Sequence, residues 1–273
     1  TEADEINFQN SKNCYYRGEE LKNDRVRDHD HFTGKYRGAA HNQCNLNAKK
    51  VNFVPVFFHN LSHYDAHLFI KQLLTKLTSK QKEYFKLLAK NSEDYISFQF
   101  GCLRFLDSYR FLQGSLDNVT KSMIDEDFKI TRLFYQNDED FKLLRKKGSV
   151  PYSFYTSHDS FKETTLTHEM FYDELKNELE PESVYQKAKT TWDHFNCQNH
   201  GEFIDLYLKS DVLLLADLFE KFREVNLRYF EIDPCHCYSA PGLTWQAGLK
   251  YTDINLELLT DIDNLLSFEK AIR

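Results

Sequence analysis

The chain has 273 residues, of which 41% are hydrophobic, 28% charged and 15% aromatic. Its 23 phenylalanines and 16 tyrosines, against 9 glycines and 5 prolines, exclude a disordered, collagen-like or low-complexity chain, because such chains lack core-building aromatic residues. The net charge of -7 argues against a protein that holds nucleic acid by bulk electrostatic attraction. It is compatible with an enzyme whose carboxylates hold metal ions against a nucleic-acid backbone.

The sequence contains no apolar run of about 18 residues, so no membrane-spanning helix is predicted. The first ten residues carry acids and no apolar stretch, and we therefore expect no secretory signal. Six cysteines without such a signal predict a reducing compartment, with free thiols or a metal site in place of disulfides.

The first 50 residues are polar and indicate a small separate module. Its glycine-containing segment 33–38 predicts a hairpin turn, and residues 39–48 predict the helix that follows. The composition changes after this module, because the run Phe53–Phe58 is apolar enough for a buried strand. Apolar residues spaced through 64–74 then predict a helix packed on that strand.

The downstream elements indicate an α/β fold. The apolar run 212–216 predicts that the last helix is buried on most sides. We expect a module at 1–50, a main domain at 51–232 and a linker at 233–273. The predicted elements, in chain order, are strands at Tyr95–Phe100 and Leu103–Leu106 around Gly101, a capped helix start at 115–123, and helices at 134–147, 167–195 and Glu202–Phe230.

The first module carries a group of residues suited to phosphodiester hydrolysis. A hairpin that leads into a helix would bring Asp28, His29 and Asn45 together from two elements. A carboxylate and an amide oxygen hold a hard divalent cation, and a neutral imidazole deprotonates water. These three side chains are therefore candidates for metal-dependent cleavage of a nucleic-acid backbone.

This segment resembles the recombination endonuclease VII branch of the HNH, or ββα-metal, nucleases. Their pattern is Cys-x-x-Cys, Asp-His-Asp-His, Arg-Gly and then Cys-x-x-Cys-Asn. The resemblance implies that Asp28 and Asn45 hold the catalytic metal and that His29 is the general base. It also implies that His31 helps to bind the phosphate or the metal.

The zinc ligands of that family are only partly present. Cys14, His41 and Cys44 match three of the four positions, but Arg17 stands where the partner of Cys14 is expected. Arginine stays cationic and cannot ligate zinc, so the module is expected to bind Zn²⁺ weakly. The alternative interpretation is a decayed zinc-knuckle fold that positions no chemistry.

A second group of residues spans the main domain. Asn60 and Asp65 follow the strand at 54–58 directly, and open α/β sheets place their sites just past such a strand. Far downstream, Tyr207 and Asp211 lie at i and i+4 on one face of the long helix. Asp211 precedes the most apolar turn, where a carboxylate needs a cation or a partner. Lys209 and Arg223 are the candidate partners in sequence.

These residues resemble the second and third exonuclease motifs of family B DNA polymerases, Asn-x-x-x-(Phe/Tyr)-Asp and Tyr-x-x-x-Asp. The surrounding sequence is similar to the protein-primed, organellar and viral type, including copies in eukaryotic mobile elements. Ser115-Leu116 fits the single-strand-binding motif of that group, and Asp107-Ser108 fits the usual lead-in to it.

The resemblance implies a ribonuclease-H-like exonuclease domain with two Mg²⁺ or Mn²⁺ ions. Asp65 and Asp211 would hold the metals, and Tyr207 would orient the attacking water. Asn60, Ser115 and Leu116 would bind the single-stranded 3′ end of DNA, and a terminal priming protein would be a partner. An origin in a eukaryotic mobile element would imply the nucleus.

The family's remaining catalytic residues have no counterpart. No Asp-x-Glu precedes Asp65 in the order that the family requires, and no polymerase palm aspartates follow. The chain is therefore expected to be an internal part of a longer polymerase, inactive by itself. Two alternatives stay open: a free-standing metal-dependent endonuclease run by Asp28, His29 and Asn45, and a non-catalytic nucleic-acid-binding remnant.

Overall fold

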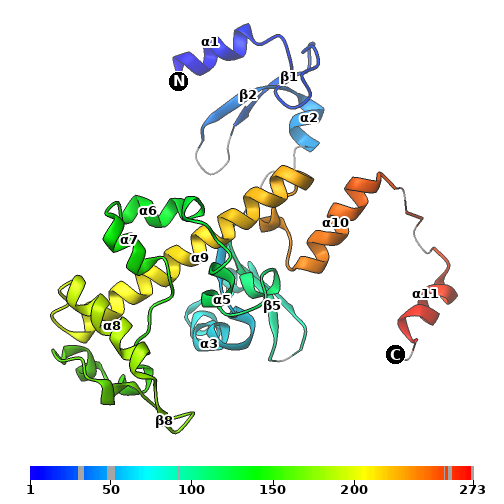
Figure 1. Cartoon of the computed structure of the whole chain (residues 1–273). Coiled ribbons are helices and arrows are strands. Elements are labelled where there is room, and N and C mark those ends of the chain that lie inside the picture. The colour runs from blue at the N-terminus through cyan, green and yellow to red at the C-terminus, as the bar shows by residue number, and fades with distance from the viewer. Residues whose placement is uncertain (30–33, 48–52, 92, 255, 258–259, 272–273) are drawn as a thin grey trace.

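The computed structural model describes residues 1–29, 34–47, 53–91, 93–254, 256–257 and 260–271. The first elements lie together at one end of the molecule (Figure 1). Helix α1 (Glu2–Asn10) begins at a capping box formed by Thr1 and Asp4, and strands β1 (Arg25–His29) and β2 (Tyr36–His41) pair in antiparallel fashion. This pairing confirms the predicted hairpin. Helix α2 (Asn42–Asn47) follows, three residues later than the predicted start, because Ala39–His41 belong to β2. The prediction for His31 lies outside the described residues.

A four-stranded mixed sheet forms the centre of the following segment. Its order is β3-β6-β5-β4, with β3 and β6 parallel and the other pairs antiparallel. The predicted hairpin around Gly101 is confirmed, because Gly101 has a φ of 57° that suits its turn. The bounds are Val54–Phe58 for β3, Phe85–Ala89 for β4, Tyr95–Phe100 for β5 and Leu103–Asp107 for β6.

Helix α3 (Ala66–Lys76) connects β3 to the rest of the sheet and covers one of its faces. A π-helical turn at Leu61–Asp65 precedes it, and the short helix α4 (Ser79–Lys82) follows it. Leu61, Ala66 and Ile70 pack against Phe98 in one apolar cluster. The predicted helix is therefore confirmed, beginning two residues later than expected. The prediction of a buried strand is wrong, because β3 is only partly buried and Val54 at its start is exposed.

Helix α9 (His200–Phe230) is the longest element, and the other layers pack along it (Figure 1). Phe57 of β3 meets Phe219 with ring centroids 3.8 Å apart, which joins the sheet to the helix. Leu214 and Leu218 pack against Leu116 and further apolar side chains. The other helices here are α5 (Leu116–Thr120), α6 (Lys129–Phe134), α7 (Asp138–Leu144) and α8 (Glu182–His194).

The helix predicted over 167–195 is wrong in its first half. Only Glu182–His194 is α-helical. The side chain of Asp173 accepts the backbone N–H groups of Leu175 and Lys176, and Asn177 has a φ of 55°, so the backbone turns back on itself. The strands on either side of this turn are β7 (Tyr172–Asp173) and β8 (Glu178–Leu179).

A half-buried ion pair lies just before the last elements in the chain. Arg223 of α9 donates to both carboxylate oxygens of Asp233, at 3.0 and 2.6 Å. Although burial acts to raise the pKa of Asp233, Arg223 and the Cys235 N–H hold it at about 2. The remaining helices are α10 (Ala240–Thr252), α11 (Ile262–Glu269) and 3-10 turns at Ser108–Arg110, Asp125–Asp127, Tyr152–Phe154, His158–Lys162, His168–Phe171 and Pro234–His236.

None of the helices among the described residues is long and apolar enough to cross a membrane. The six cysteines are free thiols. Cys197 is buried, whereas Cys102 is exposed because it lies in the turn between β5 and β6.

Asp217 fixes α6 to α9 through a buried carboxylate. It is 1% exposed, and it accepts the backbone N–H groups of Ile130 at 2.6 Å and Thr131 at 2.9 Å. The Thr131 hydroxyl donates to it at 2.6 Å. The two N–H groups belong to the first turn of α6 and have no partner within their own helix.

We predict that Asp217→Asn lowers the free energy of unfolding by about 3 kcal/mol, because an amide group would face buried N–H donors that now share a charged acceptor. Urea unfolding followed by circular dichroism measures this change. Asp205→Asn, an exposed site on the same helix, is the matched control and should change stability by less than about 0.5 kcal/mol. Equal effects of the two substitutions would contradict the assignment.

Candidate active site

The carboxyl ends of β3 and β6 lie side by side, because the two strands run parallel with Phe58 opposite Asp107. This is the edge at which open α/β sheets hold their ligands. The chain leaves β3 through Asn60, whose φ of 73° is accessible to asparagine more readily than to most residues. Asn60 and Asp65 are therefore brought to the edge that the sequence predicted.

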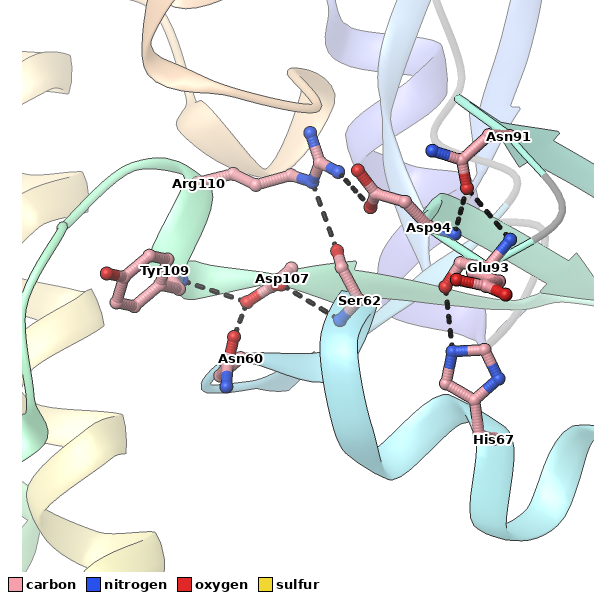
Figure 2. Close-up of polar contacts among 9 residues, drawn as sticks. All are labelled: Asn60, Ser62, His67, Asn91, Glu93, Asp94, Asp107, Tyr109 and Arg110. Carbon is pink, nitrogen blue, oxygen red and sulfur yellow. Dashed lines mark hydrogen bonds and ion pairs between the residues drawn. The ribbon is translucent and has the colours of Figure 1, made fainter.

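Asp107 holds this edge together (Figure 2). It is 1% exposed and accepts three backbone N–H groups, from Asn60 at 2.8 Å, Ser62 at 3.0 Å and Tyr109 at 3.0 Å. One carboxylate thus ties the loop after β3 to the end of β6. Its role is to position Asn60 and the start of the turn that leads to Asp65.

Arg110 adds a second tie at the same edge. It donates to the Ser62 hydroxyl at 3.1 Å and to the carboxylate of Asp94 at 2.7 Å (Figure 2). The ring of His59 lies between the Ser108 hydroxyl at 3.0 Å and the Gly114 carbonyl at 2.8 Å. The loop that carries Asn60 is therefore fixed from both sides.

Asp65 ends the turn and begins α3, without a hydrogen bond from its side chain to the helix N-terminus. Burial raises its pKa, and the negative charge of Asp107 raises it further. A carboxylate in this position is stabilised by a cation or a proton.

Tyr207 and Asp211 lie one turn apart on α9. Burial raises the pKa of the Tyr207 hydroxyl well above its ordinary range, and this hydroxyl contacts that of Tyr152. Oδ1 of Asp211 is buried without a hydrogen-bond partner among the described residues, and Oδ2 lies 3.5 Å from Nζ of Lys147. Burial raises the pKa of Asp211, and Lys147 and the nearby Tyr207 hydroxyl only partly offset this effect.

Lys147 is the partner that sequence reasoning missed. Lys209 instead lies over the rings of Phe134 and Tyr135, and Arg223 pairs with Asp233. The expectation that one of these two pairs with Asp211 is therefore wrong. The sequence signal for Lys147 is the basic run at 145–147.

The two halves of the predicted site have different neighbours. The charge of Asp107 acts on Asp65, whereas Tyr207 and Lys147 are the groups that act on Asp211. Within the described ranges, no group of three or more His, Cys, Asp or Glu side chains is arranged to hold a metal ion. These residues do not fit a two-metal Mg²⁺ or Mn²⁺ centre, although the orphaned oxygen of Asp211 is a suitable single ligand.

In the N-terminal module, Asp28 is engaged by neighbouring side chains. Arg37 donates to both of its oxygens at 2.8 and 3.1 Å, and the Tyr16 hydroxyl donates at 2.8 Å. Asp28 is fully buried, whereas His29, the next residue, is exposed. Oδ1 of Asn45 is buried without a partner among the described residues. A metal at Asp28 would have to displace an ion pair.

The predicted zinc ligands are only partly brought together. Burial acts to raise the pKa of the Cys14 thiol, but backbone N–H groups of His41, Arg17 and Tyr16 and the thiol of Cys44 lower it overall. The His41 ring pairs instead with Asp24, at 3.0 Å. Cys14, Cys44 and His41 do not form a metal-binding group in the described part of the chain.

The predicted single-strand motif caps α5. The side chain of Ser115 accepts the Asn118 N–H at 3.3 Å, as expected of a helix N-cap. Leu116 is 6% exposed and packs with Phe128 and Leu214 in the core. Its side chain therefore contributes packing and offers no surface to DNA.

Comparison with known families gives one match. The family model described as DNA polymerase type B, organellar and viral, matches residues 44–247. Comparisons with curated proteins and with solved structures give no match. The matched segment includes Asn60, Asp65, Ser115, Tyr207 and Asp211.

We predict that Asp211→Asn raises the free energy of unfolding at pH 7 by about 1 kcal/mol, because it removes a buried charge. The pKa of Asp211 is raised above its ordinary value of 3.8, so its favourable contribution is present below that pH and lost as the pH rises through the folded-state pKa. The gain should therefore disappear near about pH 3.

Denaturant unfolding at both pH values measures this difference. Asp205→Asn, which removes an exposed charge from the same helix, should change little at either pH. A loss of stability in Asp211→Asn at pH 7 would show that the carboxylate has a stabilising partner.

Proposed function

The chain belongs to the organellar and viral type B DNA polymerases, and from this premise we propose that residues 51–232 form the 3′–5′ exonuclease region of such an enzyme. Members of this family are DNA-directed DNA polymerases, so DNA is the partner that the family implies. We propose further that the region has a ribonuclease-H-like fold, that the enzyme is of the protein-primed type with a terminal priming protein as partner, and that it replicates a viral or mobile element.

One observation carries the assignment of the catalytic residues. Asp211 keeps a buried, unpartnered carboxylate oxygen beside Tyr207 and Lys147. A protein selected for stability alone would satisfy or remove this group, since an unpaired buried oxygen commonly costs about 1–3 kcal/mol. Its retention supports a role in chemistry, in which Asp211 holds a cation and Tyr207 orients the attacked phosphate or water. A bound metal would stabilise charge on the phosphate.

Asn60 is the proposed contact for the DNA 3′ end. Its backbone N–H is occupied by Asp107, and its φ of 73° directs the residue out of the strand at the ligand-binding edge. Its amide side chain offers both donors and acceptors to a sugar or phosphate.

The endonuclease VII-like alternative has less support. Asp28 is held by Arg37 and Tyr16, and this pairing competes with a metal for the same two oxygens. We therefore propose residues 1–50 as a structural or DNA-contacting module. Metal-dependent nicking of circular DNA that is lost in His29→Ala would reverse this preference.

Asn60→Gly should weaken binding of a single-stranded oligonucleotide by about fivefold, because it removes the amide yet tolerates the positive φ. Fluorescence anisotropy with a 5′-labelled oligonucleotide measures the dissociation constant. Asn196→Gly is the matched control, since Asn196 also has a positive φ, of 50°, and is exposed. Unchanged affinity in Asn60→Gly would remove Asn60 from the DNA site.

The 273-residue chain by itself should show exonuclease and polymerase activity at background. Asp65 and Asp211 are two of the four carboxylates that the family resemblance implies, and loss of one stabiliser of transition-state charge commonly costs about a hundredfold in rate. The assay follows a labelled single-stranded oligonucleotide with Mg²⁺ or Mn²⁺. Degradation that both Asp65→Ala and Asp211→Ala abolish would show that the site is complete.

A further inference from the structure

A cavity of about 460 Å³ lies beside Tyr207, on the side of α9 that faces α7 and α8. Helices α7 and α8 flank the first half of α9 (Figure 1), and His194 of α8 meets Asp140 of α7 at 2.6 Å. The cavity is lined by the end of α7 and the residues that follow it, by α8 and by the first half of α9. The cavity has the size of a small-ligand site.

Four lysines line this cavity, which we call the lysine pocket. They are Lys142, Lys146, Lys147 and Lys187, and the lining residues include no aspartate or glutamate. Lys147 pairs with Asp211, whereas the structure shows no ion pair to the other three within the residues it describes. In a chain of net charge -7, such a concentration of unpaired cations attracts an anion.

The floor of the lysine pocket is apolar. Leu144, Ala188 and Phe203 are buried there, and Ser149 and Ser183 also line the cavity. The pocket therefore suits a ligand that joins an anionic group to a flat or apolar part. A nucleotide has this composition, with a phosphate that lysine binds as a point charge.

A second cavity of about 440 Å³ continues from the first. The two share Lys147, Gly148 and Ser149, and the second is also lined by Tyr152 and Tyr172. These residues are 65% and 43% exposed, and exposed aromatic side chains are the kind on which bases of a single strand stack. Two connected cavities extend beyond a single nucleotide, which favours a strand over a mononucleotide.

We propose that the lysine pocket binds phosphodiester groups of single-stranded DNA next to Asp211, through Lys142, Lys146 and Lys187. The same phosphate chemistry is present in a free nucleotide, which is the competing source. The proposal rests on the proposed function in one respect only, that the anion is DNA. It assigns binding and no hydrolysis, so a measurement of DNA binding tests it without any need for exonuclease activity.

The test compares Lys142→Gln/Lys187→Gln with Lys82→Gln/Lys86→Gln in the full chain. Both pairs are exposed and each variant loses two positive charges, but Lys82 and Lys86 lie in α4 and in the outer strand β4. Anisotropy with a labelled oligo(dT) should show an affinity loss of about tenfold in the pocket variant. Loss of two phosphate contacts should also reduce the slope of log affinity against log salt by about 1.4. The control variant should keep both the affinity and the salt slope of the unchanged chain.

Equal losses in both variants would overturn the proposal, because they would reflect bulk charge. Displacement of the oligonucleotide by dTMP or inorganic phosphate at equal concentration of phosphate groups would also overturn it, in favour of a mononucleotide or phosphate site. Asp211→Asn separates this proposal from the exonuclease assignment. A pocket that still binds oligo(dT) in Asp211→Asn, with the same dependence on Lys142 and Lys187, supports the lysine pocket whatever the exonuclease assay shows.

Discussion

Burial of α9 on several sides at once is the constraint on which the structure after residue 53 depends. The sheet reaches the helix through Phe57 and Phe219, and the segment around α5 reaches it through Leu214 and Leu218. The segment around α8 packs on its first half through Phe203 and other apolar side chains. The sheet buries its other apolar cluster against α3, whereas the segments around α5 and α8 pack on α9, so the positions of these two segments relative to one another follow from α9.

The same burial gives two carboxylates of α9 opposite properties. Asp217 is enclosed and receives three hydrogen bonds from the start of α6, so its charge is fully compensated. Asp211 lies in the same helix, yet one of its oxygens has no partner in the described chain, and a single lysine lies 3.5 Å from the other. Proteins retain such uncompensated groups where a ligand completes them. The contrast separates a structural acid from a candidate catalytic acid on physical grounds.

Charge is distributed unevenly in a way that suits a DNA-handling domain. The chain as a whole is acidic, which limits non-specific attachment to nucleic acid. Lysines nevertheless gather at the cavity beside Tyr207, and Asp65 and Asp107 gather at the end of β3 and β6. Of these two carboxylates only Asp65 is proposed for chemistry, because Asp107 is occupied by three backbone N–H groups.

The sequence by itself determined the elements whose causes are local. Periodicity showed α9, the Gly101 turn showed the β5–β6 hairpin, and Ser115 marked the start of α5, because spacing and capping act within a few residues. Motif order also selected Asn60, Asp65, Tyr207 and Asp211 as candidate site residues. Tertiary structure decided what these groups touch. Lys147 became the partner of Asp211, Arg37 occupied Asp28, and Leu116 entered the core, since each contact joins segments or layers whose approach depends on packing. The turn at Asp173–Asn177 replaced a predicted helix because side-chain bonds to the backbone outweighed helical propensity.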